Sequence, residues 1–97
     1  MSHVIGGCLL KARKKETAMK EGLKLAKRFA LRNTDPYENP RGTYHGYFKF
    51  YNRTFENEEE AFKFFDDLGA YCDGVVMIKG KTKNSNPKYF AKYEVHC

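Results

Sequence analysis

The chain lacks the features that identify membrane proteins and secreted proteins. Its 97 residues contain no tryptophan, three prolines and three cysteines. No apolar run approaches the roughly 20 residues that cross a bilayer, and no basic region precedes the apolar start as in a secretory signal. The cysteines are odd in number and far apart, which argues against a disulfide framework and favours a reducing compartment. We therefore expect a cytoplasmic protein with no membrane partner.

Catalytic, cofactor and metal motifs are also missing. Cys72 and His45 offer a nucleophile and a base, but the sequence shows no third group that would orient the base. The histidines and cysteines have neither Cys-x-x-Cys nor His-x-x-x-His spacing, and Gly6-Gly7 is too short for a phosphate-binding loop. We expect a protein that is not an enzyme and that has no catalytic residues, no cofactor and no metal site.

Acidic residues are scarce at both ends of the chain. Residues 1–33 carry nine Lys and Arg against two Glu, and residues 75–97 carry five Lys against one Glu. Residues 34–74 reverse the balance, with four bases against nine acids, and the whole chain has a net charge of +6. Charge sorted in this way gives an oriented field that steers a charged partner.

Aromatic residues are abundant, with eight Phe and seven Tyr. Each buries a large area, so they can supply a hydrophobic core for a small chain. A chain of this length is expected to form one domain, residues 1–97.

Hydrophobic periodicity predicts six elements in the order βαβαββ. The predicted strands are residues 3–10, with a bend or bulge at the two glycines, 43–51, 75–78 and 88–97, and the predicted helices are residues 15–32 and 57–68. This order predicts an α+β fold, a two-layer sandwich in which two helices cover one face of a mainly antiparallel sheet of three or four strands.

Both helices have clear sequence signals. Residues 15–32 place small and apolar residues at three- and four-residue spacing, with the lysines off that stripe. Asn57 stands three residues before Glu60, the spacing of a capping box, and Gly69 is the expected C-terminal stop. We therefore expect a helix with a basic outer face, followed by a helix that begins with acidic residues.

The candidate binding residues form an aromatic and basic surface. Alternation along residues 43–51 displays Tyr47, Lys49 and Tyr51 on the sheet face away from the helices. Flexible bases at the ends of elements can grip phosphates. The predicted binding residues are Arg13, Lys14, Lys15, Tyr47, Lys49, Tyr51, Lys81, Lys83 and Lys88.

One local resemblance begins at these residues. The run Gly46–Tyr51, followed by Phe55–Ala61, resembles the third strand and second helix of an RNA-recognition motif. The resemblance covers about 16 residues of the chain, and it implies base contacts by Tyr47 and Lys49 alone. The first strand has no aromatic motif, and little room is left for the motif's second strand.

A more diffuse resemblance covers about a quarter of the chain. The residues from Phe55–Ala61 through Tyr71–Val76 are similar to small accessory proteins of bacteriophages that infect Gram-positive bacteria. This resemblance identifies no activity. It implies a non-enzymatic protein that binds a host macromolecule and modulates or inhibits it, for instance one that serves host defence.

Two functions remain open. The favoured one is docking on a host protein through aromatic anchors with charged rims, and the alternative is binding of RNA or DNA by lysines and strand tyrosines. A nucleic-acid binder must keep Glu58–Glu60 and Asp66-Asp67 away from the phosphate backbone. If both helices share one layer, their opposite charges lie side by side instead. The last strand, Lys88–Cys97, is a candidate edge for a homo-oligomer.

Overall fold

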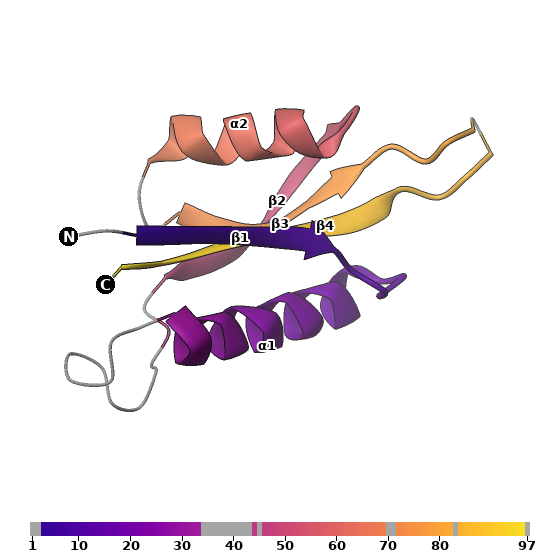
Figure 1. Cartoon of the computed structure of the whole chain (residues 1–97). Helices are drawn as coiled ribbons and strands as arrows, with labels where there is room; N and C mark the ends of the chain where they lie inside the picture. The colour runs from indigo at the N-terminus through magenta and orange to yellow at the C-terminus, as the bar shows by residue number, and fades with distance from the viewer. Residues whose placement is uncertain (1–2, 34–43, 45, 70–71, 83, 97) are drawn as a thin grey trace.

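Six elements follow one another in the order βαβαββ, as the sequence predicts (Figure 1). A computed structural model describes residues 3–33, 44, 46–69, 72–82 and 84–96. The elements are β1 (His3–Leu9), α1 (Lys15–Asn33), β2 (Tyr47–Phe55), α2 (Glu58–Leu68), β3 (Cys72–Ile78) and β4 (Lys88–His96). Within these ranges, neither helix is long and apolar enough to span a membrane.

The four strands form one mixed sheet in the order β1-β4-β3-β2. β4 pairs antiparallel with both β1 and β3, whereas β2 pairs parallel with β3. The predicted α+β class is confirmed, and two of the three strand pairings are antiparallel as expected. The parallel third pairing makes the sheet mixed.

The two helices lie on opposite faces of the sheet, so the prediction that they cover one face is wrong (Figure 1). The strand order explains the difference. β1, β2 and β3 run parallel, and the chain crosses the whole sheet from β1 to β2 and then steps back to β3. Parallel crossovers are almost always right-handed, so two crossovers in opposite directions place their helices on opposite faces.

Each face of the sheet has its own hydrophobic core. Alternation along the central strands divides the side chains, with Val75 and Ala91 facing α1 and Val76 and Phe90 facing α2. Both central strands are therefore buried on two sides, which explains the apolar run Val75–Ile78 of β3.

The glycines of β1 are explained by close packing rather than by a bulge. Pairing with β4 is continuous from His3 to Leu9, so the predicted bulge is absent. A Cβ atom on Gly6 would lie 2.8 Å from the rings of Phe29 and Tyr93. A Cβ atom on Gly7 would lie 2.8 Å from Phe62. The glycines thus allow aromatic rings to approach the strand from both faces.

The helix signals are confirmed. Buried small residues on α1 (Ala18, Gly22, Ala26 and Ala30) allow that helix to approach the sheet closely. At the start of α2, the Asn57 side chain accepts a hydrogen bond from the Glu60 amide at 2.9 Å, and the Glu60 carboxylate accepts one from the Glu56 amide at 3.1 Å. The first bond is the N-cap half of the predicted capping box, whereas the second reaches the amide one residue before the cap. Gly69 caps the other end.

The last strand is not an edge of the sheet. β4 has β1 on one side and β3 on the other, so the predicted oligomer through Lys88–Cys97 has no free strand edge to use. The error has a topological cause, because the position of a strand in the chain does not fix its position in a sheet. The sheet edges among the described strands are β1 and β2.

Candidate nucleic-acid interface

The outer face of α1 is basic because its inner face is fixed by packing. The buried residues of this helix recur at four-residue spacing, and lysine and arginine occupy the exposed positions between them. Together with the cations just before the helix, they form a surface that we call the basic layer. Its residues are Arg13, Lys14, Lys20, Lys24, Lys27 and Arg28, all of them exposed.

The opposite helix is acidic. Its first turn contains Glu58, Glu59 and Glu60, and its last turn contains Asp66 and Asp67, all exposed. We call these five residues the acidic layer. The sheet separates it from the basic layer, because α1 and α2 cover opposite faces (Figure 1). Opposite charges are therefore held apart across the molecule and do not lie side by side in one layer, as they would if the helices shared a face.

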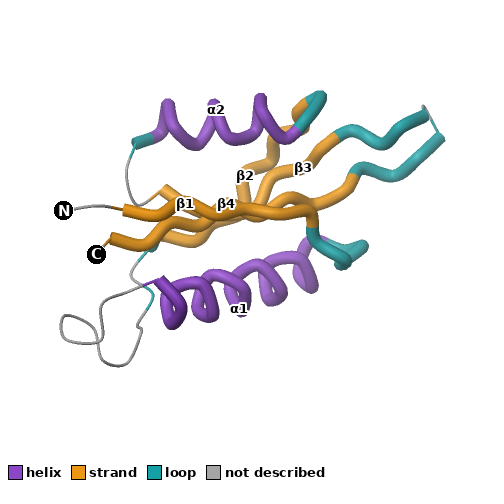
Figure 2. Tube along the Cα trace, viewed as in Figure 1, coloured by secondary structure: helices purple, strands orange, loops and turns teal. Residues whose placement is uncertain are grey.

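The predicted cationic loops meet at one end of the sheet. The parallel strands β1, β2 and β3 all end there, and the connection before α1 and the loop between β3 and β4 both extend from that end (Figure 2). A hydrogen bond of 2.8 Å from the Leu10 amide to the Tyr89 carbonyl joins the two segments. The ends of parallel strands, where helices begin, are common ligand sites in α/β sheets.

Arg13 and Lys88 lie on the same pocket at this end. Its volume is about 320 Å³, and its lining residues are Leu10, Lys11, Ala12, Arg13, Asn86, Pro87 and Lys88. A neighbouring pocket of about 510 Å³ shares Pro87 and includes Lys81 and Lys79 in its lining. The structure thus brings Arg13 and Lys88 to one pocket and places Lys81 on the neighbouring one. The predicted Lys83 lies outside the described residues.

Lys79 differs from its neighbours because it has an acidic partner. Its Nζ lies 2.5 Å from Glu56 Oε1, and this hydrogen bond raises the pKa of Lys79 above its ordinary value. Within the described part of the chain, Arg13, Lys14, Lys81 and Lys88 have no acidic side chain within ion-pair distance. All four side chains are exposed.

Lys15 occupies a different position, at the first turn of α1. Its Nζ lies 4.7 Å from the centroid of the Phe50 ring. A cation over an aromatic face is held by the ring's quadrupole. Lys15 therefore helps to fix the start of α1 against β2, in addition to carrying charge at the predicted surface.

The expected aromatic platform does not form, because α2 covers that sheet face. Tyr51 packs on Phe64 and Phe65, with ring centroids 5.5 and 5.6 Å away. Burial raises the pKa of Tyr51, with smaller contributions from Cys72 and Asp73. Tyr47 is 67% exposed and Lys49 is exposed, but both lie on the α2 side of β2, away from the basic layer.

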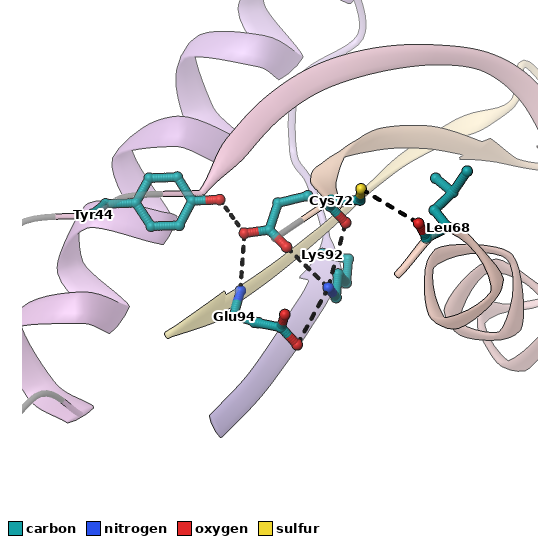
Figure 3. A network of polar contacts seen from close by, with 6 residues as sticks. Tyr44, Leu68, Cys72, Lys92 and Glu94 are labelled. Atoms are coloured by element: carbon teal, nitrogen blue, oxygen red, sulfur yellow. Dashed lines mark hydrogen bonds and ion pairs between the residues drawn. The ribbon is translucent and has the colours of Figure 1, made fainter. Parts of the chain in front are cut away.

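A buried charged network was not predicted from the sequence (Figure 3). Lys92 Nζ lies 2.9 Å from Asp73 Oδ1 and 3.6 Å from Glu94 Oε2. The Tyr44 hydroxyl donates to Asp73 Oδ2, and the same oxygen accepts a hydrogen bond from the Glu94 amide at 3.1 Å. Pairing of β3 with β4 ends at Gly74, so the Asp73 side chain replaces a strand partner for that amide.

This network is buried inside the protein and joins strands rather than forming a surface site. Asp73 is fully buried and Lys92 is 2% exposed, so neither side chain reaches the surface. Burial, followed by the hydrogen bond to Asp73, raises the pKa of Tyr44. The network therefore joins Tyr44, three residues before β2, to β3 and β4. No signal in the sequence indicated it, because Asp73 lies outside the predicted strand 75–78 and is typical of turns.

The cysteines and histidines form no metal site in the described residues, where no group of three His, Cys, Asp or Glu has suitable geometry. Cys8 Sγ lies 3.8 Å from the Tyr93 hydroxyl, and burial together with this contact raises the pKa of Tyr93 to about 12. Cys72 donates to the Leu68 carbonyl at 3.6 Å. His45 and Cys97 lie outside the described residues.

Comparison with known proteins adds no functional assignment. The chain matches no family model, no curated protein and no solved structure. Its function is therefore inferred from the placement of its own residues, of which the separation of the basic and acidic layers is the most distinctive.

Proposed function

We propose that the protein is a non-enzymatic binding protein whose ligand is the phosphate backbone of a nucleic acid. The observation that supports this function is the separation of the two charged layers by the sheet. A nucleic-acid binder has to keep its carboxylates away from the phosphates, and the acidic layer lies on the face opposite the basic layer. Binding would take place on the α1 side and at the adjoining loops.

The dimensions of α1 suit contacts to one strand. Lys20, Lys24 and Arg28 follow one another at four-residue spacing, and the rise along the helix from Lys20 to Arg28 is about 12 Å. Phosphates of one strand of a duplex advance about 3.4 Å along the axis, so this stripe faces three or four of them. Arg13 and Lys88 extend the surface beyond the start of the helix.

Binding of this kind would have little sequence preference. Tyr47, the most exposed tyrosine among the described residues, lies on the α2 side, and Tyr51 packs under α2. Neither is placed to stack on bases held at the basic layer. Contacts to phosphates position a protein without reading base identity. We therefore expect similar affinities for duplexes of different sequence.

A salt titration on a labelled duplex tests the proposal. About five phosphate contacts give a slope of about −4.5 for log K against log salt, and each contact removed reduces the slope by about 0.9. Lys24→Gln should reduce it, whereas Lys63→Gln, an exposed lysine on α2, should leave it unchanged. Absence of binding at about 50 mM salt would refute the function.

Docking on a host protein is a second candidate, favoured by one observation. Leu31 is 62% exposed at the end of the lysine stripe on α1, four residues after Lys27. An exposed apolar side chain beside charges suits a protein interface better than a phosphate backbone. An accessory protein of the phage type would use such a surface to inhibit a host macromolecule.

Leu31→Ser separates the two candidates. The substitution leaves every cation in place, so affinity for the duplex should be unchanged if the ligand is nucleic acid. If the partner is a protein, the same variant should lose the partner that the wild-type chain retains from bacterial lysate, and Lys63→Gln should retain it. A variant that weakens duplex binding tenfold would contradict a purely phosphate-directed interface.

A further inference from the structure

The two edges of the sheet are built differently. β2 carries Lys49 and Arg53, and its register with β3 shifts between Phe50 and Thr54. Charges and irregular pairing on an edge strand are the usual protection against pairing with another chain. β1 has neither, because its sequence HVIGGCL contains no Lys, Arg, Asp, Glu or Pro, and its pairing with β4 is regular along all seven residues.

The outer edge of β1 is open in the described structure. β4 is its one strand neighbour, and Figure 1 shows β1 at the front of the sheet with no described element beyond it. A seven-residue strand in this position presents a row of unpaired backbone amides and carbonyls. A partner that supplies another strand can satisfy them.

The side chains of β1 indicate which partner strand fits this edge. Ile5 and Leu9 are 43% and 39% exposed, and alternation puts both on the same face as Gly7. They are placed symmetrically, each two residues from Gly7. If two copies of β1 pair antiparallel with Gly7 opposite Gly7, Ile5 of each copy lies opposite Leu9 of the other. Both exposed apolar side chains then gain a cross-strand partner at once.

We propose that β1 pairs antiparallel with β1 of a second copy of the chain, about a two-fold axis at Gly7, so that two sheets form one continuous sheet of eight strands. Pairing with itself is favoured by the lack of charge on β1, because no like charges meet across the axis. The contact involves one strand and four apolar side chains, which is smaller than a standard interface. We therefore expect a dissociation constant of about 1 to 100 μM.

The symmetry of this dimer has a consequence for the charged layers. The two-fold axis of an antiparallel strand pair runs perpendicular to the sheet, so each face of the sheet keeps its identity in both copies. Both α1 helices then lie on one face and both α2 helices on the other. The two basic layers form one surface. That the joined surface binds a nucleic acid rests on the proposed function, whereas the dimer itself does not.

Light scattering over a range of about 10 μM to 1 mM protein tests the dimer without any nucleic acid. The wild-type mass should rise towards twice that of one chain. The variant with Ile5→Lys and Leu9→Lys should keep the mass of one chain at every concentration, and Leu68→Lys, which changes a residue 41% exposed on α2, should behave as wild type. A wild-type chain that is monomeric at 1 mM, or a double variant that still dimerises, would overturn the proposal.

Disulfide trapping tests the register independently of any effect of the lysines on folding. Ile5→Cys and Leu9→Cys, made on separate chains and mixed, should form a crosslinked dimer under oxidation. Ile5→Cys alone should not exceed the wild-type background of the native cysteines, because two copies of residue 5 lie about 14 Å apart along the paired strands. Crosslinking of Ile5→Cys alone, or none in the mixture, would overturn the register.

The failure of the dimer and the failure of the proposed function can be told apart. If the wild-type chain is monomeric but binds the duplex with the expected salt dependence, the function stands and the dimer is wrong. If it dimerises but does not bind the duplex, the reverse holds. If both are correct, the double lysine variant should bind the duplex with a smaller salt slope than the wild type.

Discussion

Lys92 is a charged side chain in the middle of the sheet, and its two carboxylate partners are buried with it. Burying an ion pair costs desolvation energy, so such a pair adds little net stability over an apolar replacement. Removing one partner is different, because it leaves an uncompensated charge. The network is therefore best tested by deleting its single cation.

Lys92→Met should lower the free energy of unfolding by about 3 to 5 kcal/mol, because Asp73 and Glu94 then remain buried without a counter-ion. Urea denaturation measures the change. Lys88→Met is a matched control, since it makes the same substitution at an exposed position of the same strand and should alter stability by less than about 0.5 kcal/mol. Equal losses in the two variants would show that the network is not a coupled unit.

Tyr93 should make stability depend on pH in the alkaline range. Its pKa is raised to about 12 in the folded state, whereas an unfolded tyrosine titrates near pH 10. The folded chain holds the proton more tightly, so this contribution is complete below pH 10 and is lost as pH rises through 12. The loss is about 1.4 kcal/mol per pH unit across that window.

Denaturation at pH 9 to 12 tests this dependence. Tyr93→Phe should flatten the curve relative to wild type, because phenylalanine has no proton to lose. Parallel curves for wild type and Tyr93→Phe would mean that Tyr93 titrates alike in the folded and unfolded chains.

The buried network shows what a sequence pattern omits at the residue scale. Lys92 and Glu94 alternate with Tyr93 and Val95, a pattern that indicates one polar face exposed to solvent. Both are nevertheless buried, because β4 lies between two other strands and α2 covers that face. Their burial depends on tertiary neighbours, and no local periodicity carries that information.

At the scale of single elements, the third residue of β3 is a glycine that the fold requires. Gly74 has φ of 155°, and a Cβ atom there would collide with the Lys49 carbonyl oxygen of the neighbouring strand. Gly69, at the end of α2, also has a positive φ, of 106°, but a Cβ atom there would have no atom within 4 Å. Substitutions at the two glycines can therefore separate the cost of an unfavourable φ from the cost of a collision between neighbouring strands.

Gly69→Ala should cost about 1 to 3 kcal/mol of stability, the cost of an unfavourable backbone conformation. Gly74→Ala should cost at least about 2 kcal/mol more, because β2 and β3 must also move apart. Urea denaturation of both variants gives the comparison. If the two substitutions are equally destabilising, the close approach of β2 to β3 contributes nothing.

Element types were predictable because their signals are local. The stripe of small residues on α1 and the Asn57 cap before α2 each span a few residues, and both appear in the structure. The start of β3 was placed three residues too late, at Val75 rather than Cys72, because Asp73 and Gly74 are typical of turns. Both residues nevertheless belong to the strand. The Asp73 side chain is part of the buried network, and Gly74 allows β3 to approach β2 closely.

At the scale of the whole molecule, the arrangement of charge matters more than its sum. Lys20→Glu and Lys63→Glu each reduce the net charge of +6 by two, but Lys20 lies on α1 and Lys63 on α2. If the field is oriented as the two layers indicate, Lys20→Glu should elute from heparin at clearly lower salt than wild type. Lys63→Glu should elute close to wild type, and similar shifts in both variants would contradict an oriented surface.

The separation of the charged layers could not be read from the sequence. The charge blocks were visible, but the helices were expected on one face of the sheet. Their placement depends on where β2 and β3 lie relative to β1, and strand order results from pairings between distant residues. The predicted cations Arg13, Lys81 and Lys88 do gather at one end, because strand ends meet there. The predicted aromatic surface assumed that both helices cover the other face of the sheet. It is absent because α2 covers this face.

The position of β4 also governs how the chain can fold. β4 is the last of the four strands to be synthesised, yet it is the only described strand neighbour of β1 and it pairs residue 96 with residue 3. Pairing over such a sequence separation has a high loop-closure cost and slows folding. While β4 is still inside the ribosome, β1 has no strand partner within its own chain. We therefore expect this sheet to form all-or-none, with β1 lacking its strand partner until β4 is available.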